Sequence, residues 1–182
     1  FSYSGQLYVA AMHVYGDSSE IGAKAIFRHA TVLQERYYLK EYAIKMYRKA
    51  ANAFQAVYGE SNIPYAQCLM ALAHIYIQSG EELEEVEKYL NQAEKIISTT
   101  LGRNNKTYVT CLKAYGDYYF AINNREKGAE YYVKASKIVK DLGYDADRFL
   151  QDIIAQHNEK VNGIYDSDLS KLIKEYFYDQ QS

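Results

Sequence analysis

The sequence predicts an all-α protein built from antiparallel helical hairpins that stack side by side. Three observations predict it. Glycines recur at a near-constant spacing, apolar residues recur at helical offsets on both sides of short polar loops, and the 182 residues include 10 glycines but 1 proline. So few turn residues disfavour a loop-rich all-β protein. One hairpin cannot bury its apolar face alone, whereas stacked hairpins share a continuous core.

The repeat is marked by four glycines in similar contexts, at spacings of 43, 43 and 41 residues: Gly16, Gly59, Gly102 and Gly143. Aligning the chain on these glycines brings other residues into register. We therefore expect a partial hairpin at 3–15 and repeats at 19–58, 62–101 and 105–142. After them, the first helix of one further hairpin is expected at 146–160.

The first helix of each repeat carries large residues at offsets of three and four, with one small residue among them. Such offsets mark one helix face. The residues are Ile26, His29, Ala30 and Leu33 in the first repeat, Leu69, Leu72, Ala73 and Tyr76 in the second, and Leu112, Tyr115, Gly116 and Tyr119 in the third. A small residue at a fixed place on that face lets a second helix approach closely.

The second helix of each repeat shows the same offsets. Its marker residues are Ala43, Tyr47 and Ala50, then Val86, Leu90 and Ala93, then Gly128, Tyr132 and Ala135. Short polar loops near 36–39, 79–82 and 123–125 separate the two helices, and short loops make antiparallel hairpins. Ser19 and Asn62 are suited to cap first helices, with Pro64 in a first turn.

The N-terminal segment 3–15 is expected to be the second helix of an incomplete hairpin. Its apolar residues would then be exposed, unless more chain or another protein covers them. The sequence begins at Phe1 rather than at Met, which indicates a part of a longer or processed chain.

The C-terminal segment 164–182 is expected to form a last helix. Asn162 and Gly163 interrupt the helical pattern, and Asp166 with Ser167 can cap this last helix. One interpretation is a capping helix that seals the array, as such arrays require. The other is a docking helix that inserts into a partner or into the array's own groove.

The composition excludes several classes of protein. Hydrophobic residues make up 48% and charged residues 24%, and the net charge is -2. A near-neutral chain lacks the basic face of a nucleic-acid binder. No apolar run approaches the ~18 residues of a membrane helix. Two cysteines cannot form a disulfide framework or a four-cysteine zinc site, and they indicate a reducing, cytoplasmic setting.

Few residues suggest catalysis. Cys68 and Cys111 occupy equivalent places in two repeats, which indicates core positions. The histidines fall at core or groove positions or are isolated, without zinc-like spacing to the cysteines: His13, His29, His74 and His157. The acidic run from Glu81 to Glu87 opens a helix, where negative charge is favourable, and there is no phosphate-binding loop. We expect no enzyme activity, no metal and no cofactor.

These helix patterns resemble the tetratricopeptide (TPR) repeat, whose usual period is 34 residues. The longer period here is similar to that of the kinesin-light-chain type. The same type is resembled by the stretch from Glu84 to Ile96, which is followed by Leu101 and Gly102. The resemblance covers about 19–143. It implies a right-handed α-α superhelix, that is, a TPR-like solenoid, and a role in protein–protein scaffolding.

A second, narrower resemblance is to the C-terminal array of axonemal TPR proteins. It rests on Tyr15 to Asp17, Phe27 to Ala30, and Lys140 to Asp145. It implies a ciliary, axonemal or microtubule-associated cytoskeletal location.

The TPR resemblance implies a concave groove lined by the first helices. By register, the groove residues are Lys24, Phe27, Thr31 and Gln34 in the first repeat, Gln67, Met70, His74 and Ile77 in the second, and Thr110, Lys113, Asp117 and Phe120 in the third. This mixed strip suits an extended peptide or helix with apolar anchors. The other interpretation is that the strip faces solvent or is covered by the chain's own termini.

The sequence therefore predicts a non-enzymatic adaptor that binds other proteins within a larger assembly. The alternative is a regulatory or substrate-recognition arm of an enzyme whose catalytic domain lies outside this chain.

Overall fold

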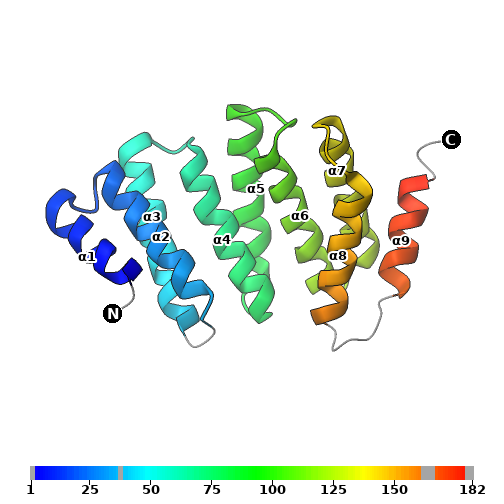
Figure 1. Cartoon of the computed structure of the whole chain (residues 1–182), viewed down its shortest axis with the longest axis horizontal. Coiled ribbons are helices and arrows are strands. Elements are labelled where there is room, and N and C mark those ends of the chain that lie inside the picture. Colours follow the sequence, from blue (N-terminus) through cyan, green and yellow to red (C-terminus); the bar gives the residue numbers. More distant parts are fainter. Residues whose placement is uncertain (1–2, 37–38, 161–166, 179–182) are drawn as a thin grey trace. The chain divides into compact units, whose positions relative to one another are not determined.

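The structure, a computed structural model, describes residues 3–36, 39–160 and 167–178, which form α-helices and no strand (Figure 1). The helices are α1 (Tyr3–Tyr15), α2 (Glu20–Gln34), α3 (Lys40–Tyr58), α4 (Ile63–Ser79), α5 (Leu83–Thr100), α6 (Lys106–Ala121), α7 (Arg125–Asp141), α8 (Ala146–Lys160) and α9 (Ser167–Tyr178). The chain divides into two compact units, Phe1–Thr100 and Leu101–Ser182. Consecutive helices pack against each other within each unit. The predicted all-α, repeat-like architecture is thereby confirmed.

The four repeat glycines each follow a helix and have a positive φ, between 70° and 81°. Glycine adopts this left-handed region without steric cost. The next helix is then capped by a side-chain oxygen that accepts a backbone N–H. The caps are Ser19 for Gly22 at 3.0 Å, Asn62 for Tyr65 at 2.8 Å, Asn105 for Tyr108 at 2.9 Å and Asp145 for Arg148 at 2.9 Å. A glycine stop and a polar start therefore define each repeat boundary.

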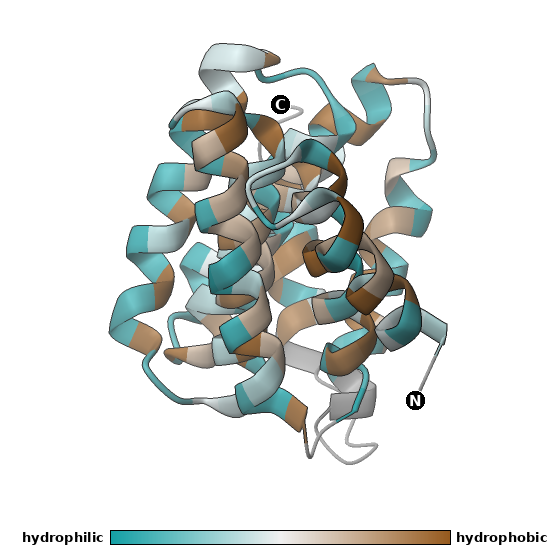
Figure 2. Ribbon diagram, turned by 90° about the vertical axis from the view of Figure 1, so that its left-hand side faces the viewer, coloured by the Kyte–Doolittle hydropathy of each residue, from teal (hydrophilic) through white to brown (hydrophobic). Residues whose placement is uncertain are grey.

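In the first unit, α2 with α3 and α4 with α5 form two hairpins, and α3 packs against α4. The small marker residues Ala30, Ala50, Ala73 and Ala93 are all fully buried. Arg48 of α3 donates a hydrogen bond to the Tyr76 hydroxyl of α4 at 2.9 Å, which links the two hairpins. Figure 2 shows hydrophobic and hydrophilic residues alternating along the helices, as helices with one buried face require.

In the second unit, α6 and α7 approach closely through two glycines. A Cβ atom at Gly116 would overlap the ring of Tyr132, and one at Gly128 would overlap the ring of Phe120. Each glycine thus provides room for an aromatic ring from the facing helix.

The C-terminal helix α9 packs against α7 and α8. Leu169 and Ile173 are buried in a cluster with Val133 of α7 and with Leu150 and Ile153 of α8. The predicted break and cap before this helix, at Asn162, Gly163 and Asp166, lie outside the described residues.

Candidate partner-binding groove

The predicted groove residues of the first unit all reach the surface. None of the eight is buried: Lys24, Thr31 and Gln67 are exposed, and Phe27, Gln34, Met70, His74 and Ile77 are half-buried. The first helices α2 and α4 therefore present an accessible strip of polar and apolar side chains.

Three of the four predicted residues on α2 converge on Tyr47 of α3. The Tyr47 hydroxyl lies 3.2 Å from the Thr31 hydroxyl and 2.7 Å from the Gln34 side-chain oxygen. The Phe27 ring meets the Tyr47 ring edge-on, with centroids 5.4 Å apart. Burial raises the pKa of Tyr47. The fourth residue, Lys24, instead pairs with Glu20 on its own helix.

In the second unit, the predicted groove residues are less accessible. Thr110 is exposed, and Lys113 and Phe120 are half-buried, but Asp117 is only 9% exposed. The Asp117 carboxylate accepts hydrogen bonds from the Lys113 ammonium at 3.0 Å and from the Tyr132 hydroxyl at 2.7 Å. Asp117 is thus committed to contacts within the unit.

His157 of α8 completes this network, which we call the Tyr132 network (Lys113, Asp117, Tyr132 and His157). Its Nε2 lies 2.8 Å from the Tyr132 hydroxyl. Because a hydroxyl has one proton and Tyr132 donates it to Asp117, His157 is assigned as the donor in the second bond. Burial, reinforced by the Asp117 carboxylate, raises the pKa of Tyr132 well above its ordinary value.

The Tyr132 network joins α6, α7 and α8, and its His157 contacts the predicted groove residue Phe120. The Phe120 ring lies 5.6 Å from the Tyr132 ring and 4.6 Å from the His157 ring, centroid to centroid. An Asp–Tyr–His arrangement resembles catalytic clusters, but Tyr132 is 0% exposed and offers no surface to a substrate. We therefore assign the network a positioning role for α8.

Sequence reasoning treated His157 as isolated, and the structure shows that it is not. One signal pointed to it. His157 follows Gly143 by fourteen residues, as Ala30, Ala73 and Gly116 follow their own repeat glycines. That register position faces a neighbouring helix, so a histidine there is expected to meet a side chain of another helix.

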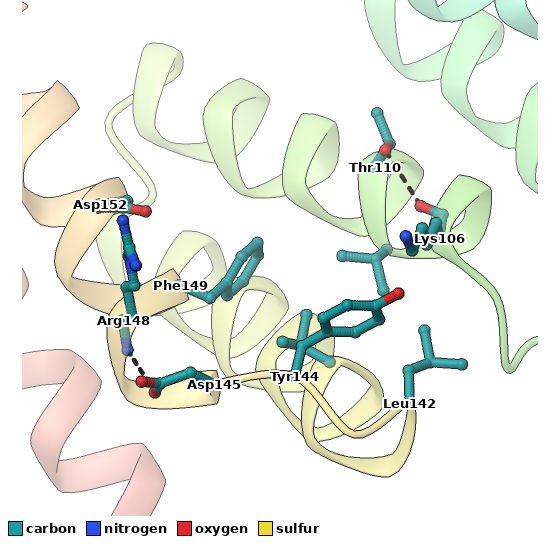
Figure 3. A pocket seen from close by; sticks show the side chains of 10 residues that line it. Lys106, Thr110, Leu142, Tyr144, Asp145, Arg148, Phe149 and Asp152 are labelled. Carbon is teal, nitrogen blue, oxygen red and sulfur yellow. Dashed lines mark hydrogen bonds between the residues drawn. The ribbon is translucent and has the colours of Figure 1, made fainter.

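A pocket of about 500 Å³ lies beside Thr110 in the second unit, between α6, the end of α7 and α8 (Figure 3). Its lining combines an apolar set with a polar and charged set. The apolar residues are Val109, Val139, Leu142 and Phe149, and the others are Lys106, Thr110, Tyr144, Asp145, Arg148 and Asp152. A predicted groove residue thus borders a cavity.

The sequence analysis named Asp145 only within a resemblance, and it did not name Lys106, Arg148 or Asp152 as site residues. The Lys106 ammonium lies 4.6 Å from the centre of the Tyr144 ring, a cation–π distance. Figure 3 shows the Arg148 side chain pointing toward Asp152, one helical turn further along α8. Cations and anions thus occur together near apolar side chains.

The two cysteines lie in the core, as their equivalent places in two repeats predicted. Cys68 and Cys111 are both fully buried, and burial raises the pKa of Cys68 to about 12. A thiol with that pKa is a poor nucleophile at neutral pH. No three His, Cys, Asp or Glu residues of the described chain are grouped to hold a metal ion. Across the same residues, no helix has both the length and the apolar character to cross a membrane.

No protein-family model matches the chain, and a comparison with curated proteins finds no match either. The packing of the helices and the surroundings of the predicted groove residues are therefore what supports a function.

Proposed function

We propose that this chain is a non-enzymatic protein–protein interaction scaffold of the TPR-like solenoid type, working as one piece of a larger assembly. Stacked hairpins hold a set of first-helix side chains in fixed positions, and a partner's extended segment or helix binds along them. The pocket beside Thr110 is the observation that carries this proposal. Its lining includes Thr110, one of the predicted groove residues of α6, and joins apolar side chains to charged ones.

The chemistry of the pocket suits a peptide segment with one apolar anchor. The side chains of Val109, Val139, Leu142 and Phe149 can pack around such an anchor. Lys106 and Arg148 can bind carboxylates, and Asp145 and Asp152 can bind cationic side chains. Mixed charges of this kind select a register for the bound segment more than they add affinity.

The strip on the first unit supports the same function. Its eight predicted residues are accessible, and Tyr47 holds Phe27, Thr31 and Gln34 in place. Positioned side chains lower the entropy cost of binding. The ciliary, axonemal or microtubule-associated setting is a narrower proposal, which rests on the second sequence resemblance alone.

Site-specific photo-crosslinking in a native extract tests the pocket. A photo-reactive residue at Thr110 is expected to label a discrete set of proteins, whereas the same residue at Lys137, on α7 outside the pocket, is not. Arg148→Glu should reduce labelling from position 110 at least threefold, because it reverses a charge of the lining. Equal labelling from positions 110 and 137 would remove the pocket from the proposal.

A further inference from the structure

The N-terminal helix α1 has apolar residues on every side. From Tyr3 to Tyr15 it has no Asp, Glu, Lys or Arg. One side packs against α2, where Gly5 and Ala11 are buried and Tyr8 stacks on His29 with ring centroids 5.0 Å apart. A helix that is hydrophobic all round is normally buried all round.

The other side of α1 carries an exposed apolar stripe. Tyr3 is 82% exposed, Leu7 44% and Val14 66%, and Ala10 is exposed between them. Their offsets of four, three and four place the four residues on one face of the helix. Figure 2 looks onto the side of the first unit at which the chain begins. We call these four residues the α1 stripe.

The equivalent positions in the other second helices, α3 and α5, are buried rather than exposed. Leu7 precedes its repeat glycine by nine residues, as Ala50 and Ala93 precede theirs, and both alanines are 0% exposed. Ala10 corresponds in the same way to Ala53 and Ile96, which are also buried. These two register positions are therefore buried in α3 and α5 but exposed in α1.

The packing of α3 identifies the missing neighbour. Helix α3 lies between α2, the first helix of its own hairpin, and α4, the first helix of the next. Helix α1 packs against α2, the first helix of the next hairpin, just as α3 packs against α4. Helix α3 also packs against α2, the first helix of its own hairpin. Within the described residues, α1 has no such hairpin partner.

We propose that the α1 stripe docks one antiparallel amphipathic helix from outside these 182 residues, in the place that α2 occupies on α3. Its contact face is uncharged, because a charge buried against the stripe would have no partner. It carries Gly or Ala opposite Leu7, because the side chain is bulkier there than in α3 and α5. This inference is independent of the groove and of its pocket.

A fusion in register tests the proposal. A copy of residues 62–88, which contains α4, its loop and the first turns of α5, is placed directly before Tyr3. Tyr3 then takes the place that Tyr89 has after Lys88 in the second repeat. The control fusion carries the same added residues with the helical part scrambled.

The docked helix is expected to slow amide hydrogen exchange within α1 at least tenfold relative to the scrambled fusion, because opening α1 then requires the added helix to leave. Leu7→Glu should abolish this protection in the fusion and shift the melting midpoint of the unfused chain by less than about 1 °C, since an exposed substitution costs little.

Equal exchange in the two fusions would overturn the proposal. So would a concentration-dependent dimer of the unfused chain, detected by sedimentation, that Leu7→Glu dissociates. The occupant of the stripe would then be a second copy of this chain.

Discussion

The first and third hairpins place a tyrosine at the same register position and use its hydroxyl differently. Tyr47 and Tyr132 both lie in the middle of a second helix, and both rings are almost fully buried. The Tyr47 hydroxyl bonds to exposed Thr31 and half-buried Gln34, whereas the Tyr132 hydroxyl lies between the Asp117 carboxylate and His157. The second hairpin has Leu90 there and needs no polar partner.

The difference shows how a repeat can vary without changing its fold. The ring fills the same volume in each hairpin, so packing is preserved. The polar neighbours of the hydroxyl differ between the two hairpins, and the accessibility of the first-helix side chains beside it differs with them. Around Tyr47 the first-helix strip remains open, and around Tyr132 it is partly covered by α8. Variants that alter one hydroxyl, or the room around its ring, test this contrast.

Removing the Tyr132 hydroxyl should have the largest effect. Tyr132→Phe leaves the buried Asp117 carboxylate and the His157 ring without their shared partner, at a cost of about 2–3 kcal/mol in the free energy of unfolding, as for hydrogen bonds to charged groups. Chemical denaturation measures it. The matched control, Tyr47→Phe, should cost less than about 1 kcal/mol because water can replace the lost partner of Thr31 and Gln34. Equal losses would show that the two hydroxyls are energetically equivalent.

Filling the space at Gly116 should have the next largest effect. A Cβ there overlaps the buried Tyr132 ring. Overpacking costs about 1–3 kcal/mol, and the better helix propensity of alanine offsets up to about 1 kcal/mol. We expect Gly116→Ala to lower the free energy of unfolding by about 1–2 kcal/mol and to raise the exchange rate of α7 amides.

The first hairpin supplies the comparison for this variant, because it combines Ala30 with Tyr47 at the equivalent positions. A neutral Gly116→Ala would mean that Tyr132 can turn to an arrangement that tolerates alanine, as Tyr47 does. Hydrogen exchange distinguishes this outcome, since the Tyr132 network would then be broken without loss of global stability.

Truncating His157 should loosen α8 locally. His157→Ala removes the hydrogen bond to Tyr132 and the contact with the Phe120 ring, at a cost of about 1 kcal/mol. We expect faster amide exchange in α8, with α6 and α7 unchanged. Gln151→Ala, at an exposed position of the same helix, is the control and should leave exchange as it is. If both variants behave alike, His157 does not position α8.

Most of the fold could be predicted from the sequence, because the signals involved are local. A glycine that must adopt positive φ, an Asn or Ser three residues later and apolar residues at offsets of three and four determine where each helix begins, ends and faces. The structure has these features at Gly59, Asn62, Leu69 and Leu72 as the pattern predicts.

The polar contacts of the candidate site could not be predicted in the same way. Register alone places Asp117 on the groove face, and it cannot say that Tyr132 reaches it from the next helix. The contact depends on the rotamer of a long side chain and on the room left by Gly116. The pocket beside Thr110 likewise requires Lys106 and Arg148 of different helices to approach in space. Such contacts follow from packing rather than from spacing along the chain.

The smallest expected effect is a dependence of stability on alkaline pH. The pKa of Tyr132 is raised in the folded chain, whereas a tyrosine in the unfolded chain ionises near pH 10. Ionisation then favours the unfolded state, so the stability due to this group is complete below pH 10 and falls as the pH rises above it. At pH 10.5 the loss is about 0.8 kcal/mol.

Denaturation at pH 8.5 and pH 10.5 measures this loss as the difference between the wild-type chain and Tyr132→Phe. Tyr47→Phe provides the contrast. Its hydroxyl bonds to the uncharged side chains of Thr31 and Gln34, so it should ionise in the folded chain more readily than a hydroxyl bonded to a carboxylate. The pH-dependent loss attributable to Tyr47 is therefore expected to be smaller. A larger loss for Tyr47 would show that the Asp117 carboxylate does not hold Tyr132 in its neutral form, and the contrast between the two hairpins would then be one of shape alone.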